Sequence, residues 1–236
     1  MIDFALVIKS LGPQAVRLQE HEHKTVDAPA LEVLEDQSAP MRCQAIQKWL
    51  DAYKVLQSFE LPMRSKITDA VLRWADDRET TKELITVDAL VESHQQVMST
   101  CVAAFGKQRE FTSLSSKALW LCYPQYVPIY DDFAVRALQM VSKLEDGLAF
   151  AADQSSRYGE FIRVWMTLYQ RYSEALESVH LGEYPYRVRV FDKILWLLGE
   201  PRYGLREPLS DFPEEQCTVS SSAPKAATAN PCKESP

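Results

Sequence analysis

A lysine and an aspartate stand fourteen positions apart in the middle of the chain, within the run SSKALWLCYPQYVPIYDD, residues 115–132. An amine beside a carboxylate can attack an electrophilic carbon, while the carboxylate stabilises developing positive charge or transfers protons. Lys117 and Asp131 are therefore candidates for covalent catalysis, provided that the fold brings them to one cavity.

The segment between these two residues predicts a path that brings them together. Lys117 is expected in the first turn of a helix through Cys122, which advances by about 1.5 Å per residue. The following YPQYVPI, residues 123–129, contains two prolines and can return the chain in extended form at about 3.3 Å per residue. Asp131 or Asp132 is then placed to cap a helix over 133–144.

The remaining chain from about residue 40 to residue 200 is also expected to be helical. Apolar residues recur there at spacings of three and four, which is typical of helices with one buried face. Only seven glycines occur, and alternation of apolar and polar residues is scarce, which argues against all-β and doubly wound folds. The pattern predicts an all-α fold with helices over 41–59, from Pro62 through Trp74, over 87–105 with a stop at Gly106, over 156–179 and over 187–199.

The composition of the chain changes at its ends. The segment 208–236 is rich in Pro, Ser and Ala and poor in large apolar residues, so we expect a disordered tail after a helical domain over 1–207. The stretch Ala28–Pro40 is a weaker linker candidate. In EHEHK, residues 20–24, two histidines at i and i+2 diverge on a helix, which favours a solvated charged segment over a metal site.

Charge argues against nucleic-acid binding as a bulk property but not locally. The formal net charge is −7. Residues 184–206 nevertheless carry a local charge of +3, and residues from 207 to the end carry −3. Because binding depends on local patches, the basic stretch keeps an anionic partner open.

The five cysteines show no metal-ligand spacing, so reduced thiols are expected and no zinc or iron–sulfur cofactor is. No apolar run approaches the roughly 18 residues that a membrane span needs. The beginning, MIDFALVIKSLG, is a poor signal peptide because it is short and carries an early acid. We therefore expect a cytoplasmic protein without a membrane partner.

The run VPIYDDFAVRAL resembles the stretch that carries the catalytic aspartate in the helix-hairpin-helix DNA glycosylase superfamily, which includes endonuclease III and 8-oxoguanine glycosylase. The longer run SLSSKALWLCYPQYVPIYD, with the later RVFDKILWLLG, resembles more closely a bacterial branch of uncharacterised glycosylase-like proteins. Some members of that branch are associated with antiphage defence operons. The resemblance covers roughly residues 85–200.

This resemblance implies a two-lobed helical fold and base excision from DNA. The target nucleotide would be extruded into a pocket between the lobes, Lys117 would attack the sugar C1′, and Asp131 would stabilise the sugar cation. Other residues would bind the substrate: Ser115 and Ser116 in a phosphate-binding turn, Trp120 beside the base, and Arg187, Arg189, Lys193, Arg202 and Arg206 at phosphates.

The sequence departs from the family pattern in three respects. The segment QREFTSLSSK has no glycine where the family hairpin has two, the interval between lysine and aspartate is about one helical turn shorter than in endonuclease III, and no cysteine cluster follows. A non-catalytic module that binds nucleic acid, or a partner protein from a defence operon, is therefore the second hypothesis.

The candidate residues also have ordinary structural readings. Lys117 could be an exposed helix lysine, and Asp131 a cap. Trp120 could be core, and the arginines could form a solvated helix face. For Asp192, a buried structural ion pair is favoured over a role in the site.

Overall fold

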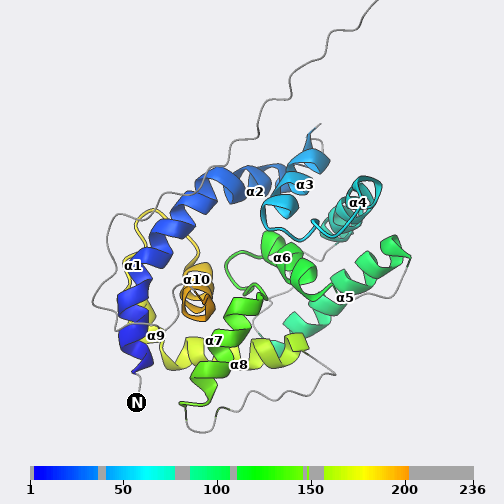
Figure 1. Cartoon of the computed structure of the whole chain (residues 1–236). Coiled ribbons are helices and arrows are strands. Elements are labelled where there is room, and N and C mark those ends of the chain that lie inside the picture. The colour runs from blue at the N-terminus through cyan, green and yellow to red at the C-terminus, as the bar shows by residue number, and fades with distance from the viewer. Residues whose placement is uncertain are drawn as a thin grey trace, which may run out of the picture. The chain divides into compact units, whose positions relative to one another are not determined.

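The computed structural model describes residues 3–36, 41–77, 86–106, 111–145, 148 and 157–201. Within these residues all regular structure is helical, so the expected all-α fold is confirmed. The elements are α1 (Phe4–Glu22), the π-helical turn η1 (His23–Asp27), α2 (Ala28–Glu35), α3 (Arg42–Ala52), α4 (Leu61–Asp77), α5 (Val87–Phe105), α6 (Thr112–Cys122), α7 (Asp132–Ser142), α8 (Arg157–Arg171), α9 (Ser173–Glu177) and α10 (Arg187–Gly199) (Figure 1).

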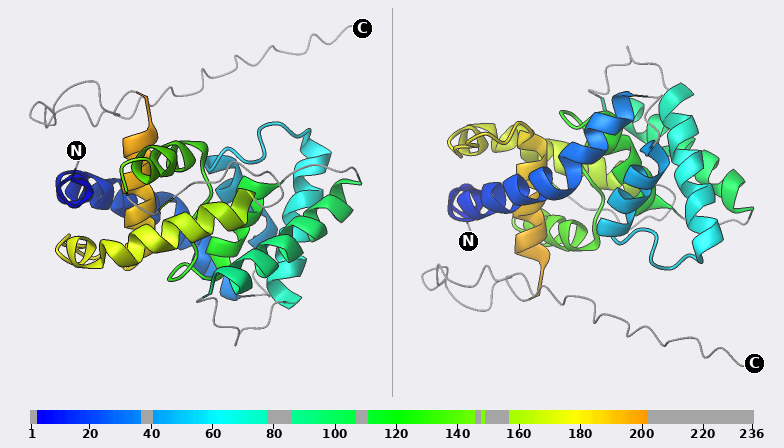
Figure 2. Two further views of the ribbon diagram at one scale, coloured as in Figure 1. Left: turned by 90° about the horizontal axis from the view of Figure 1, so that it is seen from below. Right: turned by 90° about the horizontal axis from the view of Figure 1, so that it is seen from above.

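Helix α10 is the most enclosed element. It packs mainly against α7 and α1, and Figure 2 shows it crossing α1. Eleven of its thirteen residues are buried, including Arg189, Asp192 and Lys193. The solvated face considered for the cations of this helix is therefore absent at Arg189 and Lys193, because neighbouring helices cover them.

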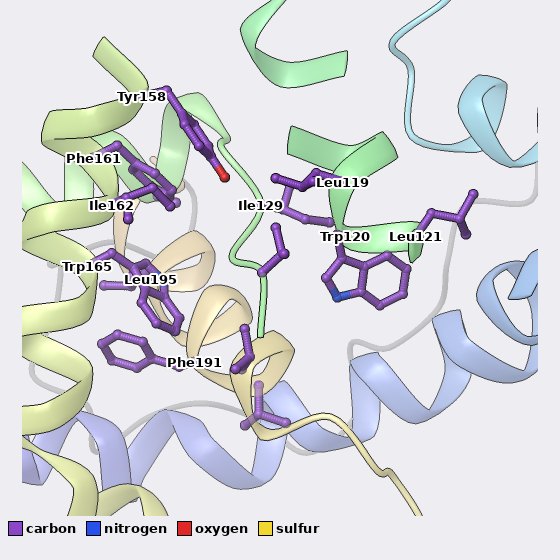
Figure 3. Packing of buried hydrophobic residues seen from close by; sticks show 14 of the residues in the cluster. Leu119, Trp120, Leu121, Ile129, Tyr158, Phe161, Ile162, Trp165, Phe191 and Leu195 are labelled. Carbon is purple, nitrogen blue, oxygen red and sulfur yellow. The ribbon is translucent and has the colours of Figure 1, made fainter. Parts of the chain in front are cut away.

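A second set of contacts joins α4, α5 and α6. Helix α5 packs against α4, α6 and α8. Between α6 and α10 runs an extended segment whose Ile129 lies between Trp120 on one side and Phe191 and Leu195 on the other (Figure 3). This packing fixes the segment that leads from Lys117 to Asp131.

Several residues that were predicted to begin or end helices do so in the structure. Gly106 stops α5 in the left-handed conformation, with φ 71°, where glycine avoids a steric penalty. Pro62 occupies the first turn of α4. Asp131 is the N-cap of α7, and its side chain accepts a hydrogen bond from the Phe133 N–H.

The interval 28–40 was expected to be a linker, and this was wrong over residues 28–35. Helix α2 occupies them, with a proline in its first turn, where the missing N–H is tolerated. Ala30 and Leu34, four positions apart, are buried. Their burial makes the short helix part of the core. Residues 37–40 lie outside the described residues.

Two helices end earlier than predicted. The helix expected over 41–59 stops at Ala52, and Lys54 has φ 60°, a left-handed conformation that no α-helix continues through. The helix expected over 156–179 is interrupted at Tyr172, which has φ −109° and ψ 21°. The Tyr172 ring packs edge-on against Phe4, with ring centroids 5.1 Å apart, so a tertiary contact accompanies the break.

The first 27 residues contribute elements that the pattern analysis did not assign. Asp3 caps α1 by accepting a hydrogen bond from the Ala5 N–H, and the helix buries an apolar stripe against α10. The EHEHK segment spans the end of α1 and the beginning of η1.

The described helices belong to one compact unit, residues 1–204. The segment 208–236, expected to be disordered, lies outside the described residues, as do Arg202 and Arg206. No helix among the described residues is long and apolar enough to cross a bilayer.

Candidate functional site

A cavity of about 390 Å³ is the place where the two predicted catalytic residues meet. This volume lies in the range of ordinary small-molecule sites. Seven charged residues line it together with Tyr53 and Trp196: Glu22, Lys54, Lys117, Asp131, Arg189, Asp192 and Lys193. These residues come from α1, the segment directly after α3, α6, the segment before α7, and α10, so the cavity depends on elements from both ends of the described chain.

Lys117 is not an exposed helix lysine. Its relative exposure is 4%, and its ammonium group donates a hydrogen bond to the Ser113 hydroxyl at 2.6 Å. Burial lowers the pKa of Lys117 from 10.5 to about 8. The Asp131 carboxylate opposes this shift and the Arg189 guanidinium adds to it. An appreciable fraction of neutral, nucleophilic amine therefore exists at mildly alkaline pH.

Asp131 combines the capping role with a position on the cavity wall. One carboxylate oxygen accepts the Phe133 N–H at 2.9 Å, which fixes the side chain at the first turn of α7. The carboxylate lines the same cavity as Lys117 and acts electrostatically on its pKa. The structure thus brings together the lysine and the aspartate that the sequence singled out.

The Ser116 side chain fixes the turn between Lys117 and Asp131. Its hydroxyl donates to the Ser113 carbonyl oxygen and accepts from the Tyr130 N–H, both at 3.0 Å. The second bond ties α6 to the residue just before Asp131. Ser116 is consequently a positioning residue for the pair.

Asp192 forms a buried structural ion pair, as the sequence analysis favoured. Its carboxylate accepts the Ile129 N–H at 2.8 Å and the Trp165 indole N–H at 2.8 Å, and Arg189 contacts it at 3.4 Å. Burial raises the pKa of Asp192 to about 6, while the Arg189 charge and these hydrogen bonds lower it. Asp192 therefore anchors the segment before Asp131 to α10.

Arg189 and Lys193 place two cations on the α10 side of the cavity. The Arg189 guanidinium lies over the ring of Trp120, 5.3 Å from its centroid, and donates to the Tyr53 hydroxyl at 3.3 Å. The Lys193 ammonium lies 4.9 Å from the Trp196 ring centroid. Ring faces attract cations, so both groups are held in place by neighbouring aromatic side chains.

The sequence analysis missed two acids at the edge of this site. Glu22, the last residue of α1, accepts a hydrogen bond from Lys193 at 2.5 Å. Asp27 is fully buried and accepts from the Trp49 indole and the Tyr53 hydroxyl, both at 2.9 Å. The spacing of apolar residues in α1 (Phe4, Val7, Ile8, Leu11 and Ala15) could have predicted the helix that carries Glu22. It could not have predicted the contact of either acid with distant residues.

Burial also raises the pKa of Asp27, and its second carboxylate oxygen has no hydrogen-bond partner among the described residues. It does not line the cavity. Asp27 accepts a hydrogen bond from the Tyr53 hydroxyl, and that hydroxyl accepts one from Arg189. Asp27 thus helps to position Tyr53 at the cavity wall.

Four predicted substrate contacts do not line the cavity: Ser115, Ser116, Trp120 and Arg187. The Ser116 hydroxyl is instead bonded to the Tyr130 N–H. Ser115 and Trp120 are both fully buried. The Ser115 N–H is already bonded within the helix to the Phe111 carbonyl oxygen, and Trp120 stacks on Trp49, with centroids 6.0 Å apart. Ser115 therefore cannot offer a phosphate-binding turn, and Trp120 cannot face a base. The preceding residues 107–110 lie outside the described part of the chain.

Arg187 is also placed away from the site. Its guanidinium donates to the carbonyl oxygens of Leu176, in the last turn of α9, and of Val179, just after that helix. Arg187 does not line the cavity, so the expected phosphate contact is not supported at this site.

No group of three or more His, Cys, Asp or Glu side chains within the described residues is arranged to hold a metal ion. Comparison with protein-family models, with curated proteins and with solved structures gave no significant match.

Proposed function

We propose that the chain is a DNA glycosylase with lyase activity, in which Lys117 is the nucleophile and Asp131 stabilises the sugar cation. The observation that supports this proposal is the burial of the Lys117 amine, with its pKa lowered to about 8, in a cavity that Asp131 also lines. Nucleophilic lysines are activated in this way, by desolvation and by neighbouring cations.

The reaction would begin with the neutral amine attacking C1′ of an extruded nucleotide. The bond between C1′ and the base nitrogen breaks, and its electron pair leaves with the base, which takes up a proton. The Asp131 carboxylate stabilises the positive charge that develops on the sugar. The amine then loses a proton to become neutral again.

The second stage would form a Schiff base. The bond between C1′ and O4′ breaks, O4′ takes up a proton, and the nitrogen electron pair forms a protonated imine with C1′. A proton is then lost from C2′, the C2′–C3′ double bond forms, and the bond between C3′ and its oxygen breaks with its electron pair leaving on the 3′ phosphate, which is the lyase step. Addition of water to the remaining imine returns the free amine and leaves an unsaturated open-chain sugar aldehyde. Ser113, which accepts a hydrogen bond from the Lys117 ammonium, would hold the amine before attack.

The test is reductive trapping. The chain is incubated with duplexes that carry damaged or modified bases, or an abasic site, in the presence of borohydride, which reduces the imine to a stable secondary amine. A covalent adduct is expected, and its rate of formation should rise with pH through about 8 as the amine loses its proton. Lys117→Ala should abolish the adduct while its circular dichroism spectrum stays unchanged. Absence of an adduct across the whole panel would contradict the proposal.

A specific observation also favours a second function, a module that binds a partner protein without catalysis. Cations expected at phosphates contact groups inside the protein: Arg187 donates to backbone carbonyl oxygens, Arg189 contacts Asp192, and Lys193 contacts Glu22. In that case no duplex affinity would be measured, and no adduct would form with any substrate.

A further inference from the structure

Glu22 places a carboxylate directly against the two cations of α10. One of its oxygens lies 2.5 Å from the Lys193 ammonium nitrogen, and the other lies 3.9 Å from the Arg189 guanidinium. The Lys193 and Arg189 side chains are only 10% and 6% exposed, whereas that of Glu22 is 32% exposed. An anion from the end of α1 thus sits at the rim of the cavity, between two enclosed cations.

We propose that Arg189 and Lys193 form a phosphate subsite in this cavity and that the Glu22 carboxylate occupies it until a substrate phosphate displaces it. This inference rests on the proposed function and adds a recognition element to it. Its ligand is a phosphate group attached to the sugar that Lys117 attacks.

The subsite would persist without Glu22 because other groups hold both cations. Arg189 is fixed by Asp192, by the Tyr53 hydroxyl and by the ring of Trp120. Lys193 lies over the ring of Trp196. A guanidinium and an ammonium at one place suit a phosphate group, which accepts several charge-assisted hydrogen bonds at once.

Glu22 is suited to leave. It ends α1 and directly precedes the π-helical turn η1, an irregular form of helix that is often found at functional sites. Its side chain is already about one third exposed, so its movement into water exposes little new charge.

Phosphate binding measured by calorimetry tests the subsite. Inorganic phosphate and 2-deoxyribose 5-phosphate are titrated at pH 6.5 and constant ionic strength into the unmodified chain, Glu22→Gln and Glu20→Gln. Glu22→Gln should bind both probes at least about tenfold more tightly, because the internal competitor loses its charge. Glu20→Gln removes the same charge from the same helix, outside the cavity lining, and should change nothing.

Two further variants keep the result decisive. Adding Lys193→Gln to Glu22→Gln should remove the gain. If Glu22→Gln does not fold, Glu22→Asp shortens the side chain while keeping its charge, and should show a smaller gain in the same direction. A folded Glu22→Gln, or a folded Glu22→Asp in its place, that binds both probes no more tightly than the unmodified chain would overturn the subsite.

A parallel titration with a duplex that contains an abasic site shows whether the bound phosphate belongs to a small sugar phosphate or to the DNA backbone. A gain confined to deoxyribose 5-phosphate supports a subsite for small sugar phosphates, and a gain that extends to the duplex supports a subsite for the DNA backbone. Borohydride trapping reports independently on Lys117. A phosphate gain without an adduct supports the subsite and contradicts the glycosylase, and an adduct without a phosphate gain does the reverse.

Discussion

Burial of the Lys117 amine has a consequence for stability that needs no substrate to measure. Its pKa is about 8 in the folded chain, below the ordinary 10.5. Between these two values the unfolded chain binds more protons than the folded chain, so this group makes stability rise with pH through that window. Below about pH 8 the full penalty of a buried charge remains.

We therefore predict that Lys117→Met stabilises the protein by about 1–3 kcal/mol at pH 7. The gain should shrink as pH rises from about 8 to 10.5. Urea unfolding at several pH values measures it. Lys66→Met, which replaces an exposed lysine of α4, should have little effect at any pH, and a pH-independent effect of Lys117→Met would contradict the burial argument.

Asp131 allows its two roles to be separated by one substitution. Asparagine is as good an N-cap as aspartate, so Asp131→Asn should keep the bond to the Phe133 N–H. At pH 7 it should lower the free energy of unfolding only through the lost attraction between the Asp131 carboxylate and the buried Lys117 ammonium. Loss of the negative charge should slow adduct formation by about 100-fold or more.

The matched control is Asp132→Asn, one position later in the first turn of α7 and outside the cavity lining. Its adduct rate should stay within about twofold of the unmodified chain. Equal loss of rate in both variants would show that general charge near α7, and not the Asp131 carboxylate, is what the reaction needs.

Helices α7 and α10 pack backbone against backbone at Gly199. A Cβ added there would lie 1.9 Å from the Phe133 carbonyl oxygen, a backbone atom. Because backbone cannot swing aside as a side chain can, Gly199→Ala must push the end of α10 away from the first turn of α7, which carries Asp131. We predict a loss of about 1–3 kcal/mol in the free energy of unfolding, together with a slower adduct reaction.

Gly106→Ala serves as the comparison for that variant. Its φ of 71° disfavours alanine, but nothing lies within 4 Å of the added Cβ. It should lower stability by about 1 kcal/mol and leave the adduct rate unchanged once the protein is folded. If Gly199→Ala changed stability alone, the close approach would matter for packing and not for the position of Asp131.

The elements also show what local sequence can predict. Gly106 and Asp131 act on groups within a few residues of themselves, so their roles as stop and cap were predictable. The role of Trp120 was not predictable, because helical spacing shows on which face of the helix a residue lies but not which residues cover that face. Here the covering group is Trp49, far away in the sequence.

For the whole molecule, the cavity joins residues that are distant in sequence. The bond between Lys193 and Glu22 spans 171 positions, and no spacing rule relates such residues. The lysine and aspartate pair was accessible from the sequence because a short turn connects its two helices. The acids supplied by the first 27 residues were not, because their place depends on how α1 crosses α10.

This dependence predicts a global effect of mutations in α1. Ile8 is fully buried, so Ile8→Ala should lower the free energy of unfolding by about 2–5 kcal/mol. The variant should therefore unfold, and stop forming the adduct, at a lower temperature than the unmodified chain. Leu6 lies on the same helix and is 61% exposed. Leu6→Ala should therefore change stability by less than about 0.5 kcal/mol. Thermal melts followed by tryptophan fluorescence compare the two variants.

The π-helical turn His23–Asp27 holds one residue more per turn than its α-helical neighbours. Deleting a single residue from it, Thr25 for example, would allow a regular α-helix to continue through this turn. The residues that follow would then be rotated by about 100° about the helix axis. The carboxylate of Asp27 would then point away from the Trp49 indole that it meets at 2.9 Å. The length of this turn, more than its composition, therefore sets which faces of α1 and α2 pack against the rest of the protein.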